Sequence, residues 1–105
     1  MRIVEELEAW GHPNVTGKNN MTFEFTKEKT LTKRGDCIIA VNASKGADDL
    51  SDSFKDLARR EDARITVLVR VDELEEVAVG WGNPKLTFIH KEDLVARKSS
   101  FTCGR

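Results

Sequence analysis

Alternation of apolar and polar residues at a period of two dominates the chain and predicts a set of β-strands. The clearest case is residues 64–72, "RITVLVRVD", where isoleucine and three valines share one face of a half-buried strand. Residues 77–81, "VAVGW", alternate in the same way until a glycine breaks the pattern, so the intervening residues 72–76 are expected to form a turn. Further strands are predicted within residues 21–25, 36–43, 86–90 and 94–103. The continuous apolar run inside 36–43 indicates the more central strand.

One stretch follows the helical period instead. Apolar residues recur at i, i+4, i+7 and i+8 from Leu50 to Ala58, which predicts an amphipathic helix near residues 49–61. Asp48 or Asp49 is expected to cap its N-terminus. The opening residues 1–10 fit a helix by composition, but we predict a strand because they precede the same motif as residues 77–81.

That motif, Trp-Gly-x-Pro, occurs twice, in "WGHPNVT" at residues 10–16 and "WGNPKLT" at residues 81–87, and the two copies use both tryptophans and both prolines of the chain. Proline fixes its own φ and keeps the preceding residue extended, while glycine permits backbone shapes that other residues avoid. We therefore interpret the motif as a corner at which a strand leaves one sheet for another. Its recurrence also suggests an internal duplication.

These elements together predict a mainly β protein: an antiparallel, jelly-roll-like β-sandwich with one helix, forming a single β-rich domain over residues 1–105.

Charge and composition narrow the classes of partner. The formal net charge is −1 and the isoelectric point is about 6.1, which argues against nucleic acid as a partner. No apolar run approaches the ~20 residues that span a bilayer, and the acidic, amphipathic start of the chain does not resemble a signal peptide. A cytoplasmic protein that does not act at the membrane is therefore expected, with Cys37 and Cys103 as reduced thiols.

Residues that could carry chemistry are few. The two histidines and two cysteines show none of the short spacings of a zinc site, so no metal or cofactor is predicted. The most site-like group is polar and lies in loops: His12 and Asn14 from the first corner, with Arg34 and Asp36 just before an apolar strand. Lys45, close to the start of the predicted helix, is a candidate anion-binding residue.

Several segments resemble one known family. They are residues 5–15, residues 34–39 ("RGDCII"), residues 44–62 ("SKGADDLSDSFKDLARRED") and the closing "CGR". Together they are similar to an archaeal family described as a domain of unknown function, DUF371. The resemblance spans essentially the whole chain and implies a jelly-roll-type β-sandwich, but no activity.

The same resemblance implies that related chains continue for some tens of residues past "CGR", so this chain is expected to be truncated relative to its family. Truncation would leave an unpaired strand edge, from which we predict a homodimer.

The leading functional hypothesis is a small, non-enzymatic cytoplasmic module that binds or interacts with a partner the sequence does not identify. The alternative is an enzyme or an RNA-associated factor that uses a polar site around His12, Arg34 and Asp36 at one end of the sandwich.

Overall fold

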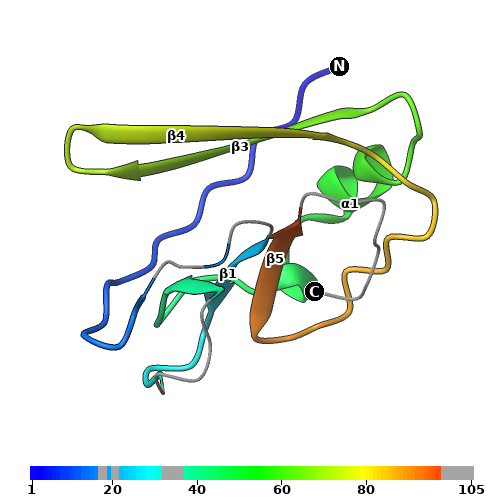
Figure 1. Ribbon diagram of the computed structural model, residues 1–105. Coiled ribbons are helices and arrows are strands. Elements are labelled where there is room, and N and C mark those ends of the chain that lie inside the picture. The colour runs from blue at the N-terminus through cyan, green and yellow to red at the C-terminus, as the bar shows by residue number, and fades with distance from the viewer. Residues whose placement is uncertain (17–18, 20–21, 32–36, 98–105) are drawn as a thin grey trace.

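The computed structural model describes residues 1–16, 19, 22–31 and 37–97. Five strands, one short 3₁₀ turn and one α-helix follow one another along this part of the chain (Figure 1). In order they are β1 (Thr22–Thr26), β2 (Ile38–Ala40), η1 (Ala47–Asp49), α1 (Asp52–Ala58), β3 (Arg64–Val71), β4 (Leu74–Trp81) and β5 (Asp93–Arg97).

The first sheet has three strands in the order β2-β1-β5. Strand β1 runs antiparallel to β5, from the pair Thr22–Arg97 to the pair Thr26–Asp93. It runs parallel to β2, with an irregularity after Glu24. The expectation of an antiparallel arrangement is therefore wrong for this pair, and β2 is a three-residue edge strand rather than a central one.

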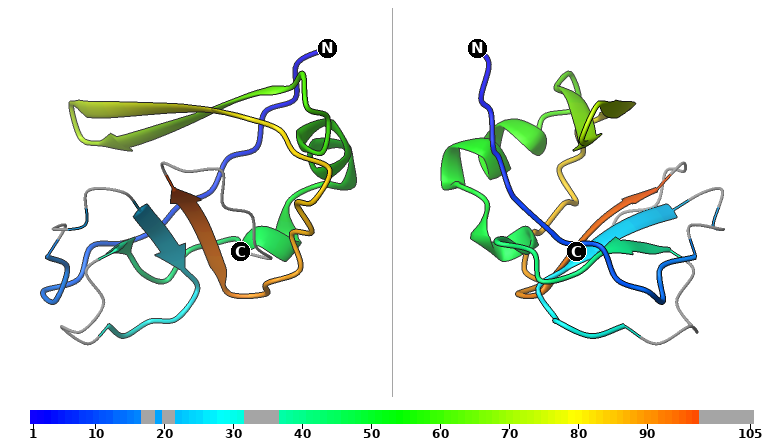
Figure 2. Two further views of the ribbon diagram at one scale, coloured as in Figure 1. Left: turned by 45° about the vertical axis from the view of Figure 1, so that its right-hand side comes forward. Right: turned by 90° about the vertical axis from the view of Figure 1, so that its left-hand side faces the viewer.

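The second sheet is the β3–β4 hairpin, whose eight-residue strands pair along their whole length. In Figures 1 and 2 it forms a layer of its own above the three-stranded sheet, with α1 near one end. A mainly β protein with one helix is thus confirmed. The described residues form two separate sheets, of three and two strands, and no closed barrel, so the predicted antiparallel, jelly-roll-like sandwich is not confirmed.

The core lies near the three-stranded sheet and the helix, and none of its buried apolar residues comes from β3 or β4 in the described part of the chain. Its buried apolar residues come mostly from the segment between β2 and β3: Leu31, Val41, Ala43, Ala47, Leu50 and Ala58. The predicted apolar stripe of the helix contributes Leu50 and Ala58 to this group. Backbone hydrogen bonds tie this segment to β1 and to the residues that precede β5: the Ala43 N–H donates to the Thr26 carbonyl, and the Asp48 N–H to the His90 carbonyl, each at 2.9 Å.

Helix α1 lies inside the predicted range 49–61 but is shorter, and its N-cap differs from the expected one. Ser51 caps it, because the Ser51 hydroxyl accepts the Phe54 N–H at 3.1 Å. Asp48 and Asp49 belong to the preceding η1 turn, where the Asp49 carboxylate accepts the Gly46 N–H at 2.9 Å. The expected aspartate cap is therefore wrong, and the cap lies two residues after Asp49.

The opening segment was expected to be a strand and is not one. Its only ladder contact among the described residues is an isolated bridge, in which Trp10 and Val41 exchange two backbone hydrogen bonds of 2.7 Å. Two residues earlier, the Glu8 N–H donates to the Ser44 hydroxyl at 2.9 Å instead of to a carbonyl. The Ser44 N–H does donate to the Glu8 carbonyl at 2.8 Å, but the return bond goes to a side chain, so the segment runs beside residues 41–44 without a regular ladder.

Residues 86–90 also form no strand, although their composition predicts one. Phe88 has a φ of +52°, which interrupts an extended chain. The carbonyls of Leu86 and Thr87 accept hydrogen bonds from the Arg59 guanidinium at 2.8 and 3.2 Å, so they are bonded to a side chain rather than to a sheet.

The turn expected over residues 72–76 is shorter than predicted. Only Asp72 and Glu73 form it, and β4 begins at Leu74. Asp72 has a φ of +52°, as the first central residue of a type II′ hairpin turn requires. This short turn sets the register of the whole hairpin.

Candidate functional site

The polar residues of the first corner are engaged in local structure. The His12 Nδ1 accepts the Asn14 N–H at 3.0 Å, and the Asn14 side-chain amide donates to the Leu31 carbonyl at 2.6 Å. These bonds shape the turn and tie it to the end of the segment that follows β1. Arg34 and Asp36 lie outside the described residues, so their convergence with His12 and Asn14 stays a prediction.

The second corner repeats the same turn with different side chains. The Asn83 Oδ1 accepts the Lys85 N–H at 2.8 Å, as the His12 ring nitrogen does in the first copy. A backbone bond of 3.1 Å from the Leu86 N–H to the Asn83 carbonyl closes it, and the first copy has an equivalent bond of 3.0 Å. A turn at the repeated motif therefore occurs in both copies, but the expectation that it leads a strand from one sheet into another is wrong, because residues 1–9 and 86–90 form no strand.

The glycines of the two corners differ in how tightly they are packed. A Cβ on Gly82 would lie 2.0 Å from the Arg60 carbonyl oxygen and 2.4 Å from that of Ala58, whereas a Cβ on Gly11 would meet nothing within 4 Å. Gly82 thus lets the hairpin pass directly over the C-terminal end of α1. A duplication of the whole chain stays a prediction.

Lys45, the candidate anion-binding residue, forms an ion pair with Glu5. The Lys45 ammonium lies 2.9 Å from the Glu5 carboxylate, whose other oxygen accepts the Ser51 N–H at 2.6 Å. A hydrogen bond from the Ser51 side chain, followed by those from Lys45 and from the Ser51 N–H, lowers the pKa of Glu5 to about 2. The α-helix begins at Asp52 rather than directly after Lys45. Anion binding at Lys45 stays a prediction.

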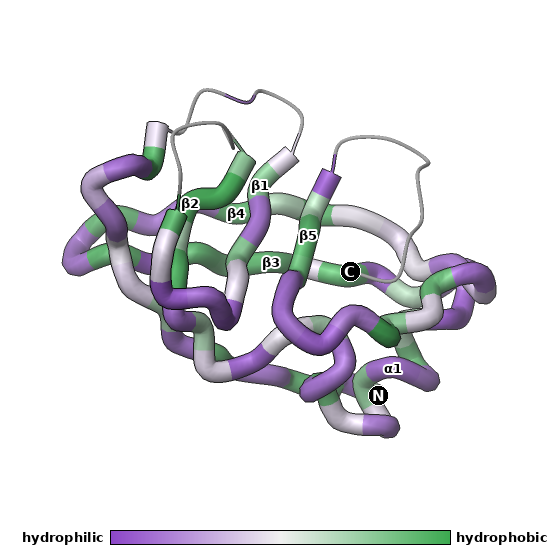
Figure 3. Tube along the Cα trace, turned by 90° about the horizontal axis from the view of Figure 1, so that it is seen from below, coloured by the Kyte–Doolittle hydropathy of each residue, from purple (hydrophilic) through white to green (hydrophobic). Residues whose placement is uncertain are grey.

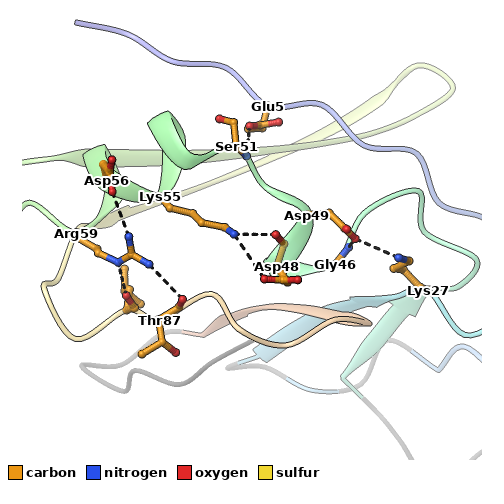
Figure 4. A network of polar contacts seen from close by, with 11 residues as sticks. Glu5, Lys27, Gly46, Asp48, Asp49, Ser51, Lys55, Asp56, Arg59 and Thr87 are labelled. Atoms are coloured by element: carbon orange, nitrogen blue, oxygen red, sulfur yellow. Dashed lines mark hydrogen bonds and ion pairs between the residues drawn. The ribbon is translucent and has the colours of Figure 1, made fainter.

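Further hydrogen bonds and ion pairs connect η1 and α1 to each other and to neighbouring segments (Figure 4). The Lys55 ammonium donates to the Asp48 carbonyl at 2.7 Å, and the Lys27 ammonium lies 3.2 Å from the Asp49 carboxylate. Arg59 reaches in the other direction, to the segment after the second corner, and lies over the Phe88 ring at 5.7 Å. The network connects neighbouring segments and has a structural role.

The sequence pattern does not predict the burial of one acidic residue, Glu24. The alternation in β1 places Phe23 and Phe25 on the covered face, yet Glu24 on the opposite face is the more buried residue, at 4% exposure. The Cys37 thiol donates to the Glu24 carboxylate at 3.3 Å. No local signal marks Glu24, because its burial depends on the segments packed over the second face of the sheet. Cys103 lies outside the described residues.

Four titratable residues gather where β1 ends and β5 begins: Glu28, His90, Glu92 and Asp93. A hydrogen bond with Glu92, followed by charge repulsion from it, raises the pKa of Glu28. The His90 Nδ1 is already used, since it accepts the Asp93 N–H at 2.9 Å. Within the described ranges, no three His, Cys, Asp or Glu side chains are arranged to hold a metal ion.

An open hollow of about 350 Å³ lies between the start of the chain and the helix. It is lined by Met1, Ile3, Ser53, Asp56, Leu57 and Arg60. None of the polar residues that the sequence singles out is among them. Its walls come from a chain terminus and a helix flank, and they bring no reactive group together.

The most distinctive surface is the outer face of the β3–β4 hairpin. The register pairs Leu68 with Val77 and Thr66 with Val79, so these four side chains lie together on one face. Trp81 ends the same row. Of the large apolar residues on this face, Leu68 is 50% exposed, Val77 60%, Val79 51% and Trp81 67%. We call the face formed by residues 64, 66, 68, 70, 75, 77, 79 and 81 the outer hairpin face.

The opposite face of the hairpin is also apolar, but it is partly covered. Ile65, Val67 and Val69 are half-buried and alternate with exposed residues, as the pattern of β3 predicts. Figure 3, where apolar residues are green, shows apolar positions recurring along both β3 and β4. The hairpin therefore covers the rest of the molecule with part of this face, whose Val71 and Leu74 near the turn are exposed, and presents the outer hairpin face to solvent.

Charges border the outer hairpin face at both ends. Near the turn, the Arg70 guanidinium lies 3.0 Å from the Glu75 carboxylate, its cross-strand neighbour. At the other end, Arg64 is opposite Trp81. An apolar centre with charged ends is typical of a recognition surface. The sequence pattern did not reveal this face, because it depends on how the two strands are paired.

The part of the chain that the structure describes contains no helix long and apolar enough to cross a membrane. Comparison with known proteins shows that residues 7–105 match the family model described as a domain of unknown function, DUF371. An uncharacterized protein of Methanocaldococcus jannaschii is 37% identical over 99 residues, which cover 94% of this chain and 73% of that relative.

Proposed function

For this chain, which belongs to the family of unknown function DUF371, we propose a non-enzymatic role as a small binding or interaction module. The observation that carries the proposal is the outer hairpin face. Four large apolar side chains that are at least half exposed lie next to one another there, on a rigid pair of strands.

Apolar surface that is exposed to water is unfavourable unless a partner covers it. Each Å² of apolar surface left in water forgoes about 25 cal/mol, and contiguous apolar patches on small proteins mark binding sites more often than chance. A lone exposed leucine or valine would need no explanation. Here the register gathers Leu68, Val77, Val79 and Trp81 on one face, which supports use of that face as a contact surface.

The alternative, an enzyme or RNA-associated factor around His12, Arg34 and Asp36, has less support. His12 and Asn14 are engaged in the hydrogen bonds of a turn whose counterpart at Asn83 has different side chains. A shared turn geometry favours a structural use of these residues. The cytoplasmic location expected from the sequence stays a prediction.

Site-specific photo-crosslinking tests the proposal. A benzophenone side chain would replace Val79 on the outer hairpin face or, as the control, Asp62, which is not one of the residues of that face and whose side chain is 72% exposed. In extract of the source organism, Val79 should yield a discrete adduct and Asp62 should not. The adduct would be identified by mass spectrometry, and its purified partner should bind Leu68→Lys at least tenfold more weakly than the original chain. Equal labelling from both positions, or unchanged affinity, would contradict an interaction role for this face.

A further inference from the structure

We infer that the outer hairpin face docks onto the same face of a second copy of this chain, forming a two-fold symmetric dimer. The inference rests on the proposed function, because it takes the same face and names its occupant. Three properties of the hairpin support it. The outer hairpin face is complementary to itself, its apolar residues are exposed on both strands, and the hairpin is a separate two-stranded sheet.

The complementarity follows from the register. A two-fold axis along the hairpin, lying between the two faces, places each strand β3 over strand β4 of the other copy, with the turns at the same end. Every residue then faces the cross-strand neighbour of its counterpart. Arg70 faces Glu75 of the second copy, and Leu68 faces its Val77, each contact occurring twice by symmetry.

The other end of the face is also compatible. In this arrangement Thr66 faces Val79 of the second copy, and Arg64 faces its Trp81. Because Trp81 is 67% exposed, its ring is available for a cation–π contact with that guanidinium. The facing pairs along the hairpin are thus Leu–Val, Thr–Val, oppositely charged or cation–aromatic, and none brings like charges together.

The reversed arrangement is excluded by charge. With the two-fold axis across the strands, β3 would lie over β3 of the second copy, and Arg64 would face Arg70. Two such repulsive pairs would form by symmetry. Like charges at a desolvated contact oppose association, so the face selects one orientation of the second copy.

Face-to-face packing also buries the exposed apolar residues of the hairpin, which pairing along a strand edge would not. Within the described part of the chain, β3 and β4 pair only with each other, and a hairpin with no further cover is marginal in water. Pairing along the edge of β4 would extend the sheet but leave Leu68, Val77 and Val79 in solvent. Face-to-face packing covers them at the usual sheet separation of about 10 Å.

The expected affinity is low, because the face is small. Eight residues per strand at about 3.4 Å each give a length of about 27 Å, and two strands give a width of about 10 Å. This flat area of about 270 Å² is well below the ~800 Å² per partner of a standard interface. We expect a dimer with a Kd on the order of 100 µM, visible only at high concentration.

Sedimentation equilibrium of the purified chain from 10 µM to 1 mM tests the dimer. The expected result is a monomer at the lowest concentration and a predominant dimer at the highest. Leu68→Lys should remove the dimer, and Arg70→Glu should do the same because it places a carboxylate opposite Glu75. The double swap Arg70→Glu with Glu75→Arg restores opposite charges and should restore the dimer. The matched control is Arg60→Glu, another exposed arginine paired with a carboxylate, Asp62 at 3.0 Å, and it should dimerise like the original chain.

Circular dichroism and melting temperature would establish that each variant is folded. A strict monomer at 1 mM overturns the inference, and so does a dimer that survives Leu68→Lys, since the second copy would then use another surface or the edge of β4. Failure of the double swap to restore the dimer overturns the proposed orientation. If the chain is monomeric but Val79 still crosslinks one defined partner, the interaction role stands and only the second copy is ruled out as its occupant.

Discussion

Glu5 provides the sharpest test of how the opening segment is held, because one carboxylate joins three segments of the chain. It accepts the Ser51 N–H at 2.6 Å and lies 2.9 Å from the Lys45 ammonium. The Glu5 side chain is only 12% exposed, so water screens these contacts weakly. We expect Glu5→Gln to lower the free energy of unfolding at pH 7.

The size of the effect follows from the charge on Glu5. Lowering its pKa from 4.5 to about 2 corresponds to at most about 3.5 kcal/mol at ~1.4 kcal/mol per pH unit. The glutamine oxygen can still accept the Ser51 N–H, but the ion pair with Lys45 is lost. A loss of about 1.5 kcal/mol is therefore expected, which corresponds to a melting temperature lower by about 8 °C for a domain of this size.

The pH dependence separates a charge effect from a packing effect. Because the pKa of Glu5 is lower in the folded state, its contribution is fully present above pH 4.5 and is lost as the pH falls towards 2. The difference between the original chain and Glu5→Gln should thus shrink steadily over that range in urea titrations. Glu6→Gln, at the exposed neighbouring position, is the control and should change little. A Glu5→Gln deficit that stays constant from pH 7 to pH 3 would refute the reasoning.

Other positions give further expectations. Gly82→Ala should destabilise the chain by about 2 kcal/mol in chemical denaturation, because its Cβ would collide with backbone carbonyls at the end of α1; Gly11→Ala, which meets open space, should stay within about 0.5 kcal/mol, and equal effects would contradict this. Asp72→Gly should raise the melting temperature, since glycine relieves the positive φ of the turn, and a decrease would show that the aspartate side chain stabilises the turn. The raised pKa of Glu28 means that its hydrogen bond with Glu92 stabilises the fold below pH 4.5 and is lost as the pH rises through the raised value. Glu28→Gln should therefore be more stable than the original chain at pH 7 but not at pH 4, as measured by urea midpoints.

How much of the fold the sequence could predict depends on how local each element is. The helix near residues 49–61, strand β3 and the two turns at Trp-Gly-x-Pro follow from periodicity or from residues only a few positions apart. The strand expected at residues 86–90 fails because Arg59, far away in the sequence, takes the carbonyls of Leu86 and Thr87. The burial of Glu24 is likewise decided by distant segments.

The candidate polar site shows the same limit. A turn at His12 could be predicted from the proline that follows, but the bond from Asn14 to the Leu31 carbonyl could not. Composition alone made these residues candidates for chemistry. Their hydrogen bonds instead supply the shape of a turn that recurs at Asn83 with other side chains.

The outer hairpin face depends on the length of one turn. A turn over residues 72–76 would pair Val71 with Val77, and the apolar residues of both strands would then share one face and cover the core. The turn contains only Asp72 and Glu73, so Val71 pairs with Leu74 and Val77 with Leu68. Because side chains alternate along a strand, this change of register turns Val77, Val79 and Trp81 to the opposite side from Ile65 and Val67.

A hairpin that is apolar on both faces needs cover on both. The rest of the molecule half-buries one face, and the structure leaves the other in water with charges of both signs at its ends. If the second face served only the stability of the monomer, polar residues there would cost nothing, as they do on most half-covered antiparallel sheets. The presence of Leu68, Val77, Val79 and Trp81 on that face therefore supports a contact with a surface outside the described residues, and the two-residue turn is the local feature that creates the surface for it.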